Sequence, residues 1–171
     1  MYKLLFSLLG FIFVNAANAL PEQPEGRFTY AHQTGIVGYE DEKTCTADGG
    51  HWDTDMELCF FDVEDWLEVR KMEAPGKFQI AIETVGGNGH SCSFQEEAVA
   101  VSDNALMSSV KVDGVSVGVS VGVSVVCEVT VTYADANTAG VTTNGNCQEF
   151  CGMRAVLDIE AAKRKMLRTA P

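Results

Sequence analysis

An unbroken alternation of apolar and small polar residues, from Val115 to Tyr133, constrains the fold of this chain more than any other feature. Every odd position in these nineteen residues is apolar, and every even position except Val126 is Ser, Gly, Thr or Glu. This period of two predicts a β-strand. One straight strand of that length would measure ~60 Å, whereas a domain of this size is ~40 Å across. We therefore expect the run to bend or divide, at Gly118 or Gly122.

The flanking residues predict an antiparallel meander from about residue 77 to residue 143. Residues 78–82 alternate in the same way, with Phe, Ile and Ile separated by Gln and Ala. The Asp-Gly pair at 113–114 is typical of a type I′ hairpin turn. That turn would pair Val112 with Val115 and leave one face of the hairpin buried.

Two segments show a helical pattern instead. Asp62 is a candidate N-cap, acidic residues follow it, and Pro75-Gly76 would end the helix. Asp158 is a second candidate cap, followed by Ile159, Ala162 and Met166 at helical spacing. These patterns predict an α+β fold: a small antiparallel β-meander with a C-terminal helix, stabilised by disulfides.

The N-terminal residues 1–19 have the pattern of a secretory signal peptide. Lys3 precedes an apolar run of about eleven residues, too short to span a bilayer, and Ala17-Asn18-Ala19 supplies a cleavage site. We expect an exported protein, periplasmic or secreted, without a membrane anchor after cleavage. Residues 20–76 would form an acidic segment with a stapled loop and a short helix. Residues 77–171 would supply the meander and the C-terminal helix, packed with 20–76 as one domain.

The chain has six cysteines, an even number that predicts disulfides in an exported protein. They are Cys45, Cys59, Cys92, Cys127, Cys147 and Cys151. A Cys45–Cys59 bridge would close a loop of about fifteen residues, worth ~3 kcal/mol. Six cysteines allow fifteen pairings. Among those that remain, we select Cys92–Cys151 and Cys127–Cys147 without an argument from spacing.

Metal binding and cofactors are not expected. Two thiols four residues apart, at Cys147 and Cys151, would suit zinc, but the three histidines show no ligand spacing. Acidic residues from Asp53 onward partly match a calcium-binding loop, but Leu58 occupies the position that requires glycine.

Acidic residues dominate the charge of the chain. The net charge is −12, which argues against nucleic-acid binding. Residues 40–73 contain twelve acids and three bases, for a net charge of −9. Such a cluster is either a solvated surface or a docking surface for a basic partner. The candidate partner-binding residues are Asp53, Asp55, Glu57, Asp62, Glu64 and Asp65.

The cysteines of the C-terminal half carry a resemblance. Cys92-Ser-Phe94, then Cys127, then Cys147-Gln-Glu-Phe-Cys151-Gly-Met-Arg154 resembles a four-cysteine pattern of small exported bacterial proteins, and is similar in style to periplasmic lysozyme-inhibitor domains. The resemblance covers about 65 residues and implies a bacterial, non-enzymatic envelope protein. No inhibitory loop motif is matched.

The sequence contains no His-Glu-x-x-His and no phosphate-binding loop. Gly-x-Ser-x-Gly occurs at 114–118 and again at 118–122, but both matches fall inside the alternating strand run and not on the strand-to-helix turn that a catalytic serine of this motif requires. We therefore expect a non-enzymatic binding protein that restrains a basic partner, such as a lysozyme-like cell-wall hydrolase. The alternative is a structural or assembly component of the envelope that uses the Val/Ser/Gly strand for β-pairing.

Overall fold

The computed structural model describes residues 20–21, 24–117, 120–152 and 155–165. The predicted signal peptide, residues 1–19, lies outside the described residues, as do Gly118, Arg154 and Met166. None of the helices in the described part of the chain has the length and apolar character needed to cross a bilayer.

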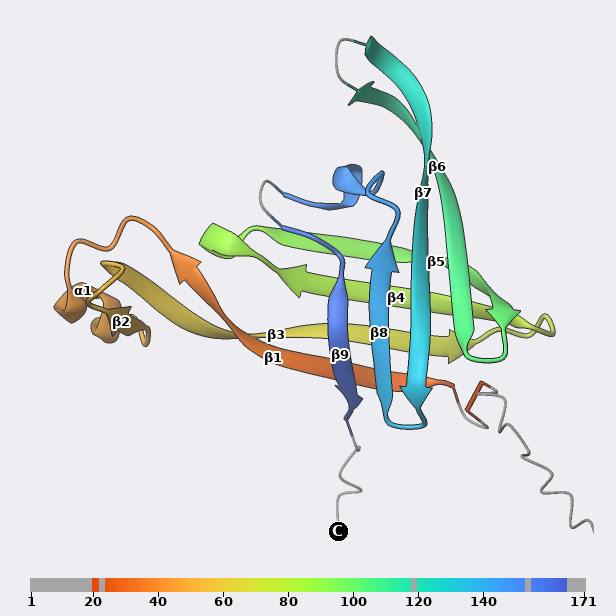
Figure 1. The fold of residues 1–171 in the computed structure, drawn as a ribbon, viewed down its shortest axis with the longest axis horizontal. Coiled ribbons are helices and arrows are strands. Elements are labelled where there is room, and N and C mark those ends of the chain that lie inside the picture. The colour runs from red at the N-terminus through yellow and green to blue at the C-terminus, as the bar shows by residue number, and fades with distance from the viewer. Residues whose placement is uncertain (1–19, 22–23, 118–119, 153–154, 166–171) are drawn as a thin grey trace, which may run out of the picture.

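Eight antiparallel strands form a closed β-barrel (Figure 1). In the order in which they neighbour one another, they are β1 (Gly26–Ile36), β9 (Ile159–Arg164), β8 (Thr138–Thr143), β7 (Ser120–Asp135), β6 (Ala105–Val117), β5 (Ser91–Ser102), β4 (Lys77–Val85) and β3 (Leu58–Lys71). The barrel closes because β1 pairs with β9 on one side and with β3 on the other. The shorter elements are α1 (Glu42–Ala47), β2 (His51–Asp53) and two 3₁₀ turns, η1 (Gly87–Gly89) and η2 (Gln148–Phe150).

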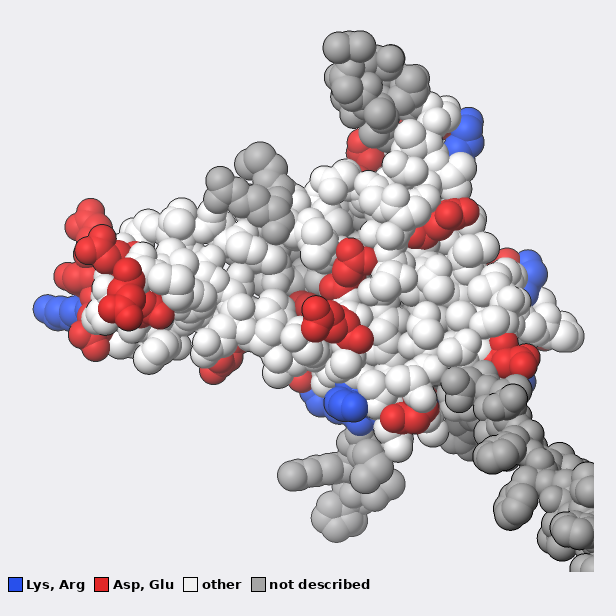
Figure 2. Space-filling model, in the orientation of Figure 1, with Lys and Arg blue, Asp and Glu red and all other residues white. Residues whose placement is uncertain are grey.

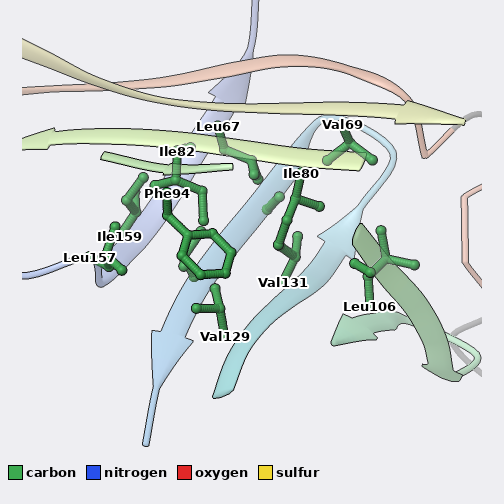
Figure 3. Close-up of a cluster of buried hydrophobic side chains, with 14 of the residues drawn as sticks. Leu67, Val69, Ile80, Ile82, Phe94, Leu106, Val129, Val131, Leu157 and Ile159 are labelled. Carbon is green, nitrogen blue, oxygen red and sulfur yellow. The ribbon is translucent and has the colours of Figure 1, made fainter. Parts of the chain in front are cut away.

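Apolar side chains from all the barrel strands fill its interior. The alternation predicted for residues 78–82 is confirmed, because Phe78, Ile80 and Ile82 are all buried in β4. Figure 3 shows ten labelled residues of this core pointing toward one another: Leu67, Val69, Ile80, Ile82, Phe94, Leu106, Val129, Val131, Leu157 and Ile159. Full burial of side chains of this size stabilises by about 1.5–3 kcal/mol each.

Two pairs of strands continue beyond the barrel as two-stranded ribbons (Figure 1). In the first, β1 and β3 stay paired from Gly26↔Val69 to Ile36↔Cys59, although β9 reaches only Phe28 and Thr29 of β1. In the second, β6 and β7 stay paired as far as Val117↔Ser120. The first ribbon carries α1 and β2 at its end.

The connection between β8 and β9 is stapled to the barrel. Cys151 is bonded to Cys92 of β5 and Cys147 to Cys127 of β7, while Cys45–Cys59 joins α1 to β3. These are the three pairs selected from the sequence. They are consistent with an oxidising, exported environment.

The predicted α+β fold class is wrong, because both predicted helices are strands. The segment that begins at Asp62 belongs to β3, which pairs with β1 on one side and β4 on the other. Leu67 and Val69 face inward with the required period of two, but Asp65 occupies an inward position before them. This buried carboxylate interrupts the apolar alternation, so the sequence pattern does not indicate a strand here.

The predicted C-terminal helix after Asp158 is strand β9. Its register against β8 pairs Ala139 with Ala162 and Val141 with Ile159, so three steps along β9 match two steps along β8. A β-bulge of this kind inserts one extra residue into a strand. Ile159 and Ala162 are therefore both buried although they are three residues apart, a spacing that imitates a helix.

The predicted hairpin turn at 113–114 is also wrong. Strand β6 runs through this Asp-Gly pair, with Val112 opposite Val125 and Val115 opposite Val123. Between these two pairs β6 advances three residues and β7 only two, so the Asp-Gly pair forms a β-bulge and not a turn. The long alternating run does divide: β6 ends at Val117 and β7 begins at Ser120, so Gly122 lies inside a strand.

Candidate functional site

The first candidate site is the tip of the β1–β3 ribbon, residues 37–58, which we name the acidic lobe. It contains α1, β2 and the turn into β3. Seven acidic residues and one lysine give it a net charge of −6: Glu40, Asp41, Glu42, Lys43, Asp48, Asp53, Asp55 and Glu57. Figure 2 shows this concentration of red side chains at the left end of the molecule.

A disulfide and two carboxylates hold the acidic lobe in shape. The Cys45–Cys59 bond joins α1 to the start of β3, and both cysteines are fully buried. The Asp41 side chain caps α1 by accepting a hydrogen bond from Thr44 N at 2.8 Å. Hydrogen bonds from the backbone and then the hydroxyl of Thr44 lower the pKa of Asp41 below its usual value, because they favour the ionised carboxylate. In the β2–β3 turn, Asp53 Oδ1 accepts from the backbone N atoms of Asp55 and Met56, each at 2.9 Å.

The structure brings together only three of the six predicted partner-binding residues. Asp53, Asp55 and Glu57 share the β2–β3 region of the acidic lobe. Asp62 and Glu64 are exposed on β3, where Asp62 accepts a hydrogen bond from Gln33 at 3.0 Å and Glu64 pairs with Lys165 at 3.1 Å.

The sixth predicted residue, Asp65, differs from the others because its side chain is buried, with only 5% of the residue exposed. Its Oδ1 accepts a hydrogen bond from Val85 N at 2.8 Å and lies 3.1 Å from His32 Nε2. The Tyr30 ring stacks on the His32 ring, with their centroids 5.6 Å apart. Asp65, His32 and Tyr30 thus form a second candidate site where the β1–β3 ribbon leaves the barrel.

Sequence reasoning singled out neither His32 nor Tyr30 as a site residue. Phe28, Tyr30, His32 and Thr34 occupy alternate positions of β1, with Phe28 and Thr34 buried. An imidazole that continues the inward phase of a strand is the signal that points to this site. Its partner Asp65 cannot be found in the same way, because it lies in a segment with a helical pattern.

The six cysteines are all used in disulfides, and the structure contains no free thiol. Cys147 and Cys151 bond to different partners, so they do not form a pair of zinc-binding thiolates. Within the described ranges, no three His, Cys, Asp or Glu side chains gather in a metal-binding arrangement.

Comparison with known proteins adds no relative. No family model, no curated protein and no solved structure matches the chain. The three disulfides are compatible with a cysteine-rich exported domain without identifying one.

Proposed function

We propose that this chain is an exported, non-enzymatic binding protein that restrains a basic partner protein, such as a lysozyme-like cell-wall hydrolase, through its acidic lobe. The proposal of a non-enzymatic role is supported by the setting of the two Gly-x-Ser-x-Gly matches, because Ser116 lies in strand β6 and Ser120 in strand β7 and neither is on a strand-to-helix turn. The proposal of export rests on the signal pattern of residues 1–19 and on the three disulfides.

The observation that carries this proposal is the position of the acidic lobe at the end of a projecting ribbon (Figures 1 and 2). A net charge of −6 on 22 residues creates a local negative potential, which accelerates encounters with a positively charged protein. The lobe also exposes apolar side chains, since Val37 is 63% and Met56 is 60% exposed. Acidic side chains would steer the partner, and these apolar ones would add contact area once it is bound.

The test is retention of a basic lysozyme on the immobilised mature chain, residues 20–171. We expect retention at low salt and release at ~0.5 M salt, where screening shortens the range of charge attraction to a few ångströms. The test variant Asp53→Asn/Asp55→Asn/Glu57→Gln keeps the side-chain shapes. The amide that replaces the Asp53 carboxylate retains an oxygen that can accept the turn hydrogen bonds.

The matched control is Glu73→Gln/Asp103→Asn/Glu149→Gln, which removes three exposed acids outside the acidic lobe. We expect the lobe variant to lose affinity by about tenfold or more and the control to lose about twofold or less. Equal losses of affinity in the two variants would show that binding depends on the overall charge of the protein, and would contradict the assignment of the binding surface to the acidic lobe. Failure to bind any basic hydrolase would contradict the proposal.

A second candidate function, a structural component of the cell envelope, is favoured by the β6–β7 ribbon. In the described residues, β6 beyond Met107 and β7 before Val126 have no strand beside them other than each other. Open strand edges are templates for pairing with another chain. This function predicts oligomers whose size increases with protein concentration and that the variant Val121→Pro abolishes. The first function predicts a protein that stays monomeric at all concentrations, with or without that substitution.

A further inference from the structure

A solvent-open cleft of about 250 Å³ lies beside the buried Asp65, outside the acidic lobe. Its walls include Tyr30 and His32 of β1, Asp65 of β3, Thr84 of β4, Asp158 just before β9 and Glu160 within β9. The cleft therefore brings the β3–β4 pair together with the start of β9, at the place where β1 closes the barrel by pairing with both β3 and β9.

The walls of the cleft are negatively charged. Three carboxylates and one imidazole line it, and its lining includes no lysine or arginine. Asp158 is held by Thr143 N, which donates to its Oδ1 at 2.7 Å, and Glu160 is exposed. The charge is thus partly fixed in position before any ligand arrives.

One carboxylate oxygen of Asp65 remains available to accept hydrogen bonds from a ligand. Its contacts with Val85 N and with His32 both use Oδ1, and Oδ2 has no hydrogen-bond donor among the described residues. His32 Nε2 is itself buried and makes no well-directed hydrogen bond, despite lying 3.1 Å from Oδ1. A carboxylate that is only 5% exposed gains more from a cationic donor than a solvated carboxylate does, because its surroundings have a low dielectric constant.

The stacked rings of Tyr30 and His32 give the cleft an aromatic wall, with 24° between their planes. A planar cation stacks on such a wall while it donates to a carboxylate, and guanidinium has this shape whereas ammonium does not. The same barrel already places guanidinium groups on rings twice, with Arg27 4.3 Å from the Trp66 centroid and Arg164 4.9 Å from the Phe28 centroid.

We propose that this cleft binds a guanidinium group, paired with Asp65 and stacked on the free face of one ring of the Tyr30–His32 pair. Asp158 and Glu160 add attraction at the mouth. The guanidinium belongs either to a free small molecule or to an arginine side chain of a bound protein, and both sources present the same chemistry. The site shares no residue with the acidic lobe and does not depend on the proposed function.

The test is titration of the mature chain with n-butylguanidinium, followed by calorimetry and by NMR chemical shifts. A parallel titration uses a short peptide with one arginine and no other charge. n-Butylammonium is the control ligand, with the same alkyl group and a charge that is not planar. We expect the guanidinium probes to shift the signals of Tyr30, His32 and Val85 and the ammonium probe to bind about tenfold more weakly.

The test variants separate the cleft from the surface. Asp65→Asn keeps an oxygen for Val85 N but removes the charge, and we expect it to weaken binding by about thirtyfold or more. Glu160→Gln changes an exposed side chain at the mouth of the cleft, and we expect a loss of about two- to fivefold. Asp62→Asn, on the same strand as Asp65 but exposed, is the matched control and should bind as the parent does.

The outcomes distinguish the sources and the alternatives. Binding of n-butylguanidinium supports a small-molecule site, and binding of the peptide alone supports an arginine side chain of a partner protein. Equal affinity for ammonium, signals shifted elsewhere, or no binding of either guanidinium probe would overturn the proposal. The variant Asp53→Asn/Asp55→Asn/Glu57→Gln should bind guanidinium as the parent does, so that a failure of the lobe and a failure of the cleft remain separate results.

Discussion

Cys151 is bonded to Cys92, which lies 59 residues earlier in the chain, and the two residues also form an isolated antiparallel β-bridge. One residue before Cys151, the Phe150 ring packs edge-on against Phe94 with their centroids 4.9 Å apart. Together with the Cys127–Cys147 bond, these contacts hold the β8–β9 connection against the barrel, and β9 follows directly from that connection.

The first prediction follows from this arrangement. Reduction of the three disulfides should lower stability more than any single core substitution, because native bridges in small secreted domains contribute ~2–5 kcal/mol each. The reference substitution is Phe94→Ala, with an expected loss of about 3–5 kcal/mol. Melting temperatures with and without reductant provide the measurement. Thiol labelling of the native protein should find no reactive cysteine, and two or more labelled sites would contradict the prediction.

The second prediction concerns Gly50, which lies against the Cys45–Cys59 bond. A Cβ atom at this position would overlap Cys59 Sγ and would lie 2.9 Å from Cys45 Sγ. Gly50→Ala should therefore displace the disulfide and destabilise the protein by about 1–3 kcal/mol. Gly87→Ala is the control, because a Cβ there meets nothing within 4 Å. Thermal unfolding compares the two variants, and equal melting temperatures would show that the acidic lobe tolerates the extra atom.

The third prediction is a loss of stability at alkaline pH through Tyr133. Burial raises the pKa of Tyr133, and the nearby positive charge of Arg164 offsets this only in part. The folded chain therefore holds the phenol proton more tightly than the unfolded chain, in which a tyrosine pKa is ~10. The stability contributed by Tyr133 is complete below that value and decreases as the pH rises above it.

Tyr133→Phe tests the pH effect directly. The variant loses the hydrogen bond from Tyr133 Oη to Pro24 O at 2.9 Å, so we expect it to be less stable at neutral pH. Its melting temperature should nevertheless decline less steeply than that of the parent above about pH 10. Parallel curves for the two proteins would assign the alkaline sensitivity to other groups.

The fourth prediction treats the outer β6–β7 ribbon as dispensable for folding. Deletion of Val115–Ser124 joins Gly114 to Val125 and keeps the native pairing of Val112 with Val125, now across an Asp-Gly turn. We expect a melting temperature within about 3 °C of the parent, equivalent to about 1 kcal/mol for a chain of this size.

The control deletion is one residue longer, Val115–Val125. It brings Val112 opposite Val126 and shifts the register by one, which turns Cys127 away from the interior. We expect this variant to unfold at a lower temperature and to lose the Cys127–Cys147 bond. If both deletions melt alike, the ribbon register does not determine the position of Cys127.

One of the two candidate sites could be predicted from local sequence patterns and the other could not. The negative charge of the acidic lobe is a property of consecutive residues, so Asp53, Asp55 and Glu57 were identified from the sequence and do lie together. The cleft was not identified, because Tyr30, Asp65 and Glu160 come from three distant parts of the chain. The pairing of Tyr30 with Asp65 across β1 and β3 brings the first two together, and no motif marks that pairing.

By itself, the sequence determined the period-two strands of residues 78–82, 115–117 and 120–133, the supply of six cysteines and the acidic lobe, because each is a property of neighbouring residues. The tertiary structure decided that the sheet closes, since closure depends on pairs such as Phe28 with Arg164 at opposite ends of the chain. It also decided that the Asp62 and Asp158 segments are strands. Each gains hydrogen-bonding partners on both sides of its backbone in the closed barrel, and this outweighs an apolar spacing that locally resembles a helix.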